Sequence, residues 1–200
     1  IGIPLRLLEG REELRENDAR TIEETNGERA HVVAITYRST ADEIMDLCNV
    51  VGTPWVQLHG SIKPSEVEKL RNRRPDISII KSLVVRPDNE AALAADLGDF
   101  GQLVDAFITD TYDPATGRIG ATGKTHDWAV SSRLVMASPR PIILAGGLTE
   151  KNVGNAVAQV RPAGVDAHTG VETVNGRKDP ERVRRFVREA QEAFRRIRQD

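Results

Sequence analysis

Short runs of apolar residues recur along the chain, and segments with apolar residues at helical spacing separate them. Such runs are typical of strands that are buried on both faces of a parallel sheet. They lie at Ile1–Leu5, His31–Thr36, Trp55–His59, Ile77–Val85, Ala106–Thr109, Ile142–Ala145 and Gly164–His168. Because helical segments connect them, the pattern predicts an α/β fold with a parallel sheet and helical crossovers.

Apolar stripes and start signals mark the helices. We expect them at Asn17–Thr25, Asp42–Val50, after Pro64, at Ala91–Leu97, near Asp127–Ala137, after Thr149 and at Pro180–Ile197. In the second helix Ile44, Leu47 and Cys48 share one face, so we expect Cys48 to be a buried structural thiol and not a nucleophile. The last helix carries an apolar stripe from Val183 to Ile197. We interpret the arginines on its other side as solvated surface and not as a nucleic-acid patch.

Two neighbouring strands near the end of the chain run into glycine. The first ends at Gly146-Gly147 and is followed by a helix-start signal at Thr149, whereas the second, in the stretch GVDAHTGVE, leads to Gly170. Glycine lets backbone N–H groups approach a ligand closely, and a helix N-terminus favours an anion. The pair predicts the phosphate site of a (β/α)8 barrel, formed by the loops after strands seven and eight. The alternative is two tight turns that bind no ligand.

Seven predicted strands would leave two unpaired edges in a barrel. We therefore expect one βα unit of roughly 25 residues before Ile1, which would complete the eight strands. The predicted fold class is α/β, a (β/α)8 TIM barrel with its first βα unit missing from the sequence, and residues 1–200 form a single phosphosugar-binding domain. The alternative is an open doubly wound sheet, but the N-terminal part lacks the glycine-rich first turn of a dinucleotide fold.

Composition narrows the possible functions. The chain is 39% hydrophobic with a net charge of −2, which suits one sizeable domain and gives no sign of a nucleic-acid or membrane partner. Its one cysteine excludes an internal disulfide and favours the cytoplasm. No apolar run approaches the ~20 residues of a transmembrane helix. Metal-ligand spacings, a Walker loop and a nucleophile elbow are absent, so we expect neither metal nor cofactor.

Polar residues at the carboxyl ends of barrel strands are catalytic candidates. Asp110 follows a strand and precedes a long loop, so it could donate a proton to a leaving oxygen, or it could cap the loop turn. His59 is either a base or a structural histidine. His168 lies beside the glycine turn and could bind an anion or the substrate, and Lys81 lies inside the barrel or extends outward at its base. From residues alone, the chain is a phosphosugar-binding barrel enzyme with an acidic group at a strand end.

Several stretches also carry a family resemblance. They are VQLHG (Val56–Gly60), Asp105–Trp128 with FITDT and GATGKTHDW, LAGGLTEKNV (Leu144–Val153), GVDAHTGVE, and Gly176–Phe186. In this order they resemble phosphoribosylanthranilate isomerase of tryptophan biosynthesis over nearly the whole chain. The resemblance implies an aldose–ketose isomerase that needs no cofactor. Its reaction is the Amadori rearrangement of N-(5-phosphoribosyl)anthranilate to 1-(2-carboxyphenylamino)-1-deoxyribulose 5-phosphate.

The resemblance also implies roles for individual residues. Asp110 matches the general acid that protonates the ring oxygen. Arg11 matches the arginine that meets the anthranilate carboxylate, which a guanidinium can hold with two parallel hydrogen bonds. His59 and His168 are substrate-binding candidates. The phosphate-binding loops correspond to Gly146, Gly147, Leu148, Gly170 and Val171.

The sequence departs from the family pattern at several places. The family's general base is a cysteine in a Lys-Ile-Cys-Gly segment of the first strand, and Cys48 cannot replace it, so we expect the base on the missing unit. PLRLLEGR, GATG and AHTG also differ from the usual family segments. Two alternatives therefore stay open: a paralogous barrel isomerase acting on another phosphoribosyl amine or phosphosugar, and a non-catalytic barrel that binds a phosphometabolite. In each case we expect a small phosphorylated ligand and a monomer or homodimer.

Overall fold

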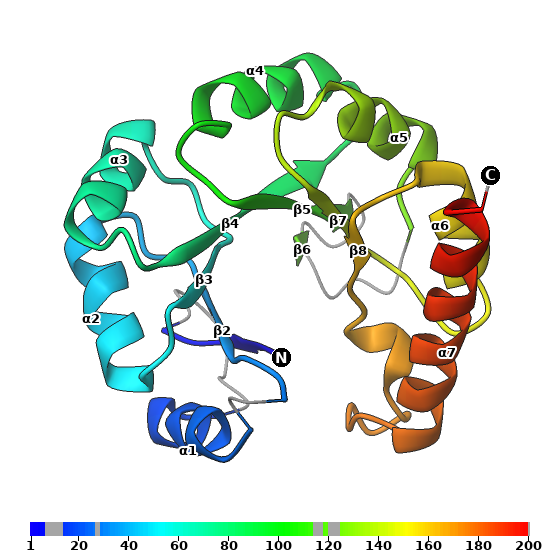
Figure 1. Cartoon of the computed structure of the whole chain (residues 1–200), viewed down its shortest axis with the longest axis horizontal. Helices are drawn as coiled ribbons and strands as arrows, with labels where there is room; N and C mark the ends of the chain where they lie inside the picture. The colour runs from blue at the N-terminus through cyan, green and yellow to red at the C-terminus, as the bar shows by residue number, and fades with distance from the viewer. Residues whose placement is uncertain (7–13, 27–28, 114–117, 120–124, 200) are drawn as a thin grey trace. The chain divides into compact units, whose positions relative to one another are not determined.

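The computed structural model describes residues 1–6, 14–26, 29–113, 118–119 and 125–199 of the chain. Strands and helices alternate along it, which confirms the predicted α/β class (Figure 1). The chain forms two compact units, residues 1–82 with 99–106 and residues 83–98 with 107–200. Each unit is described separately below, and the single domain stays a prediction. No helix among the described residues is long and apolar enough to cross a membrane.

The first unit is built on parallel strands with helices on one side (Figure 1). Its elements are β1 (Gly2–Pro4), α1 (Glu16–Asn26), β2 (Val33–Thr36), α2 (Ala41–Val51), β3 (Trp55–Leu58), α3 (Pro64–Arg73) and the greater part of β4 (Ser78–Val85). The register places Ala34 beside Ile3 on one side and beside Val56 on the other. Residues paired in register point to the same face of a sheet, so these three buried side chains form one apolar face of the first unit. Leu47 of α2 packs against this sheet in the same apolar core.

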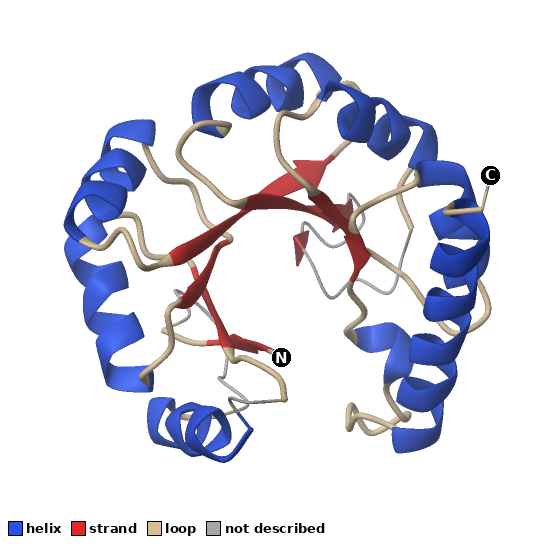
Figure 2. Ribbon diagram, in the orientation of Figure 1, coloured by secondary structure: helices blue, strands red, loops and turns tan. Residues whose placement is uncertain are grey.

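The second unit repeats this arrangement (Figure 2). Its elements are most of α4 (Glu90–Phe100), β5 (Ala106–Asp113), β6 (Arg118–Ile119), α5 (Trp128–Ala137), β7 (Ile142–Leu144), α6 (Val153–Val160), β8 (Gly164–Val165), the 3₁₀ helix η1 (Thr169–Val171) and α7 (Pro180–Ile197). Strand β7 pairs in parallel with β5 on one side and with β8 on the other. Asp179 caps α7 by accepting hydrogen bonds from the amides of Glu181 (2.9 Å) and Arg182 (3.2 Å).

Three element bounds were predicted wrongly. The last strand, β8, ends at Val165 and not at His168. The fifth strand does not end at Asp110 but continues to Asp113, because its last residues pair antiparallel with β6. The helix after the first glycine turn begins at Val153 and not at Thr149. The side chain of Asn152 accepts a hydrogen bond from the amide of Thr149 (2.8 Å), which closes a turn ahead of the helix.

The glycine turns of the second unit are anchored in its core. Leu148 follows the first turn and Val171 follows the second, and their side chains are 1% and 4% exposed. Both belong to a cluster formed with α6 and α7, in which Phe186 and Ala190 of α7 are also buried. Burying side chains of this size contributes about 1.5–3 kcal/mol each. The core therefore fixes the positions of the turns, and only their backbone is available to a ligand.

Candidate active site

Asp110 lies in β5, just beyond the part of the strand that pairs in parallel with β7. That pairing joins Phe107 to Ile142 and Ile108 to Ile143. The carboxylate is therefore at the carboxyl end of the parallel ladder, although the strand itself continues as a hairpin. The amide of Thr111 donates a hydrogen bond to Oδ1 of Asp110 (2.7 Å).

The turn after β7 depends on glycine. Gly146 and Gly147 have φ angles of 98° and 64°, which L side chains rarely adopt. The side-chain amide of Asn152 donates a hydrogen bond to the carbonyl oxygen of Gly147 (3.0 Å), which stabilises the turn. Among the described residues, none accepts a hydrogen bond from the amides of Gly147 or Leu148. These N–H groups can therefore receive an anion.

The second turn lies directly against the first. A methyl group on Gly170 would overlap the carbonyl oxygen of Leu148 and would lie 3.0 Å from Cγ2 of Thr149. Only glycine permits this approach. The structure thus brings together two turns that the sequence separates by more than 20 residues, and their backbones form one surface.

The strand that carries Asp110 also adjoins the first turn. A side chain on Gly146 would overlap the hydroxyl of Thr111 and would lie 3.2 Å from Nδ1 of His126. His126 itself contacts Oγ1 of Thr111 through Nδ1 (2.8 Å) and Oγ of Ser131 through Nε2 (2.6 Å). Burial lowers the pKa of His126 to about 4, against the smaller opposing effects of Asp110 and Asp127, so the ring is neutral near pH 7.

His126 was not among the sequence candidates. It stands in the GATGKTHDW stretch, and neither periodicity nor spacing marks it as more than a loop residue. The next residue, Asp127, caps α5 by accepting a hydrogen bond from the amide of Ala129 (2.9 Å). This cap fixes the direction in which the chain enters the helix and so directs the neighbouring histidine toward β5.

A second carboxylate follows β8. The amide of Asp166 donates to the carbonyl of Leu144 (2.9 Å), so this residue continues the parallel ladder beyond β8. The pKa of Asp166 is raised, first by the protein atoms that surround it and next by the charge of Asp110, whereas His168 and Lys178 act in the opposite direction. Asp166 is nevertheless an exposed residue, so water on its open side weakens these effects. Sequence reasoning missed Asp166 although it quoted the stretch GVDAHTGVE.

His168 lies in the segment that follows β8 and contains η1, residues 166–179, which we call the lobe. Its Nδ1 lies 3.2 Å from Oε1 of Glu172, and its carbonyl oxygen accepts a hydrogen bond from Nζ of Lys178 (3.1 Å). Lys178 also forms an ion pair with Glu172 (2.5 Å), whose side chain is 12% exposed. A guanidinium N–H of Arg182 donates to the carbonyl of Glu172 (2.7 Å). These contacts tie the segment around η1 to the start of α7.

Two other sequence candidates, His59 and Lys81, belong to the first unit. The ring of His59 stacks on Tyr37, with centroids 4.7 Å apart. Nζ of Lys81 donates to the carbonyl oxygen of Ser82 (3.0 Å) and lies 5.7 Å from the ring centroid of Phe100. Lys81 is therefore buried inside the unit and does not extend to solvent. Arg11 lies outside the described residues.

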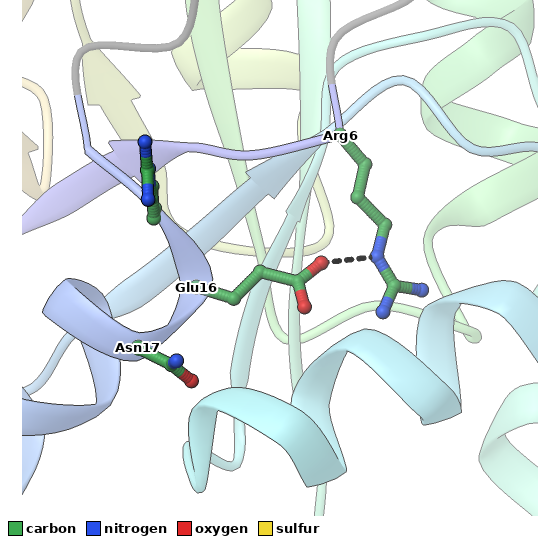
Figure 3. Close-up of a pocket in the computed structure, with 4 residues that line it drawn as sticks. Arg6, Glu16 and Asn17 are labelled. Carbon is green, nitrogen blue, oxygen red and sulfur yellow. Dashed lines mark hydrogen bonds and ion pairs between the residues drawn. The ribbon is translucent and has the colours of Figure 1, made fainter.

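A polar pocket of about 310 Å³ opens beside the end of β1 in the first unit (Figure 3). Arg6, Arg15, Glu16 and Asn17 line it. Nε of Arg6 lies 2.5 Å from Glu16 and Nη1 lies 2.8 Å from Asp46, and hydrogen bonding to Glu16 is the main cause of the raised pKa of Arg6. Because two carboxylates already neutralise this guanidinium, the pocket attracts a further anion only weakly.

The described residues contain no group of three or more His, Cys, Asp or Glu side chains that could hold a metal ion. Cys48 is buried in α2, as predicted, and burial raises the pKa of its thiol to about 11. A thiol in this state is a poor base and a poor nucleophile near pH 7.

The fold and this geometry define the class: an α/β protein of parallel strand–helix units, with a carboxylate on one strand beside two glycine turns. The family described as N-(5'-phosphoribosyl)anthranilate (PRA) isomerase matches residues 9–189. N-(5'-phosphoribosyl)anthranilate isomerase 2 of Methanosarcina mazei is 41% identical over 167 residues, which are 83% of this chain and 72% of that protein.

Solved structures agree with this match. The phosphoribosyl anthranilate isomerase of Thermotoga maritima has a TM-score of 0.78 and 28% identity over 95% of this chain and 86% of its own. A phosphoribosyl anthranilate isomerase solved in complex with reduced 1-(o-carboxyphenylamino)-1-deoxyribulose 5-phosphate has a TM-score of 0.75 and 25% identity, with the same coverage. The chain therefore belongs to the PRA isomerase family. Its fold class is the TIM barrel, and its activity is the cofactor-independent isomerisation of N-(5'-phosphoribosyl)anthranilate in tryptophan biosynthesis.

Proposed function

We propose that Asp110 is the general acid of this isomerisation and that the two glycine turns hold the phosphate of the substrate. The observation that carries the proposal is the contact between Gly146 and Thr111, which places the first turn against the residue next to Asp110. An acid that acts on a ribose ring must lie within reach of a site that binds the 5-phosphate of the same sugar.

The first step needs a proton at the furanose ring oxygen. The carboxylic acid of Asp110 donates it, the C1–O bond breaks with its electron pair going to that oxygen, and the lone pair of the anilino nitrogen forms a C=N double bond to C1. Loss of the proton at C2 then gives an enolamine, which tautomerises to the aminoketone. We assign this second proton transfer to none of the described residues, and the raised pKa of Cys48 disfavours it as the base.

The phosphate is held by backbone amides around Gly146, Gly147 and Leu148 and around Gly170 and Val171. Positive φ angles at the first turn and the close approach of the second support this role. Helix α6 begins at Val153, several residues beyond the first turn, and the effect of a helix dipole is confined to its first turn. Phosphate binding therefore depends more on the backbone amides of the turns than on the dipole of α6. Inorganic phosphate should therefore compete with the substrate. A crystal soaked in phosphate or sulfate with these turns empty and an anion elsewhere would contradict this assignment.

The remaining contacts follow from chemistry and resemblance. We propose that Arg11 meets the anthranilate carboxylate and that His59 and His168 contact the substrate. A monomer or homodimer in the cytoplasm stays our prediction, and a sequence with a single cysteine, which cannot form an internal disulfide, supports the location.

The test is turnover of N-(5'-phosphoribosyl)anthranilate by the full-length protein, followed by the change in anthranilate fluorescence. Asp110→Asn keeps the shape of the side chain but cannot donate a carboxylic proton, so kcat should fall by roughly 10²–10⁴-fold with little change in KM. Asp88→Asn is the matched control, because Asp88 is exposed and has a φ of 60°, which asparagine also adopts. Near-normal kcat in Asp110→Asn would refute the assignment.

A further inference from the structure

A chain of side-chain contacts connects β5 to α5 beside the proposed acid. It runs from Oγ1 of Thr111 to Nδ1 of His126 (2.8 Å) and from Nε2 of His126 to Oγ of Ser131 (2.6 Å). The hydroxyl of Ser131 is fully buried and belongs to α5. A buried hydrogen-bonded chain of this kind fixes the orientation of each member.

The chain reaches the proposed acid through the backbone of Thr111. The amide of Thr111 donates to Oδ1 of Asp110 (2.7 Å), whereas its hydroxyl contacts His126. Rotation or displacement of Thr111 would therefore move the carboxylate as well. Thr111 is 3% exposed, and among the described residues the polar side chain that contacts its hydroxyl is His126.

The same pair of residues abuts the first glycine turn. Cβ of Thr111 and Nδ1 of His126 would each lie 3.2 Å from a methyl group placed on Gly146. The contact between strand and turn is thus made by Thr111, whose backbone amide donates to Asp110, and by His126, which contacts the hydroxyl of Thr111. A neutral imidazole can donate from one nitrogen and accept at the other, so it suits two hydroxyl partners at once.

We propose that Thr111 and His126 are positioning residues, which hold Asp110 at the distance from the phosphate turn that protonation of the substrate requires. This inference rests on the proposed role of Asp110. It predicts that loss of the pair slows the chemical step and leaves substrate binding nearly unchanged, because the backbone of the turns is still fixed by Leu148 and Val171 in the core.

The test compares steady-state kinetics of the full-length protein and its variants. Thr111→Val removes one hydroxyl at constant shape, and His126→Phe keeps a ring without hydrogen-bonding groups. Each should lower kcat by about 10–100-fold, the effect of a misplacement near 1 Å, and change KM by less than about threefold. Ser138→Ala is the control, because it removes a hydroxyl that donates to Arg140 (2.7 Å) beyond the end of the same helix.

Two conservative variants distinguish the positioning of Asp110 through Thr111 from a purely structural contact of His126 with Ser131 of α5. The amide group of asparagine falls near the place of Nδ1, whereas that of glutamine reaches the place of Nε2. His126→Asn should therefore keep the contact with Thr111 and stay within about fivefold of the wild-type kcat. His126→Gln keeps only the contact with Ser131 and should behave like His126→Phe.

Several outcomes would overturn the inference. The first is a kcat within about twofold of wild type for both Thr111→Val and His126→Phe. The second is an equal kcat for His126→Asn and His126→Gln. The third is a rise in KM at constant kcat in Thr111→Val or His126→Phe. If His126→Phe does not fold, Thr111→Val decides. Asp110→Asn is measured in parallel: if it keeps its turnover, the proposed function fails, whereas if it alone loses turnover, only the positioning role fails.

Discussion

The contact between the two glycine turns gives the sharpest test of the proposed phosphate site. In Gly170→Ala the new methyl group would overlap the carbonyl oxygen of Leu148. It would also lie 2.8 Å from the carbonyl carbon of that residue and 3.0 Å from Cγ2 of Thr149. The first two atoms belong to the backbone and cannot rotate away, so the turns themselves must separate.

The size of the effect follows from these distances. Nonbonded carbon atoms prefer about 3.5–4.0 Å, so the carbon contacts alone require a movement of roughly 0.5–1 Å. A misplacement near 1 Å can cost about 10²-fold when a site depends on fixed donors. We expect the KM for the substrate to rise by about 10–100-fold, because the amides of the two turns no longer converge on one phosphate, whereas kcat should change less, because the first turn stays against Thr111 beside Asp110. Strain of this kind also destabilises a fold by about 1–3 kcal/mol.

The assay measures kcat and KM, together with the inhibition constant of inorganic phosphate, at a temperature well below the melting point of the variant. Gly154→Ala is the matched control. Its methyl group would meet nothing within 4 Å, and alanine in helix α6 should stabilise the protein by about 1 kcal/mol. If Gly170→Ala binds substrate and phosphate as the wild type does, the turns do not form the phosphate site.

Three further predictions concern other groups. In folded protein at pH 8, iodoacetamide should alkylate Cys48 only slowly, because burial raises its pKa to about 11; mass spectrometry that finds rapid alkylation would contradict this. The pKa of His126 is lowered from 6.5 to about 4, so the unfolded chain binds more protons between these pH values and the free energy of unfolding falls on acidification through this window. When the pH falls from 7 to 5, the free energy of unfolding measured with urea should decrease on the order of 1 kcal/mol more for wild type than for His126→Phe. Equal decreases would contradict the lowered pKa of His126. Glu172→Gln removes the ion pair with Lys178 and should raise KM roughly fivefold. Glu90→Gln breaks an exposed ion pair with Arg133 and should leave KM unchanged. Equal KM values for the two variants would refute a role of the lobe in substrate binding.

The sequence by itself determined the order and type of the elements. Apolar runs predicted the strands, and helical spacing with Pro180 at the first position predicted the last helix over the same residues that the structure shows. These features depend on neighbours within one or two turns of chain, so local pattern is sufficient. The burial of Cys48 could be predicted for the same reason, since one face of an amphipathic helix must meet the core.

Local pattern failed where hydrogen bonds across a short turn or hairpin decide the conformation. The two residues of β6 are too few to show a period, so the hairpin that lengthens β5 beyond Asp110 could not be predicted. Asn152 looked like part of a helix start, but its side chain closes a turn back to Thr149 and to Gly147. In each case a hydrogen bond across a turn or hairpin outweighs a weak helical or strand preference.

The candidate site shows the same division. The glycine motifs and Asp110 were visible in the sequence, because glycine and a carboxylate after a strand each have a direct chemical meaning. Only the tertiary structure decided that Gly170 packs on the backbone of Leu148 and that His126 joins Thr111 to Ser131. Those contacts link segments that are far apart along the chain or that have no periodic pattern, and they form only when the strands pair in register and the helices pack on them.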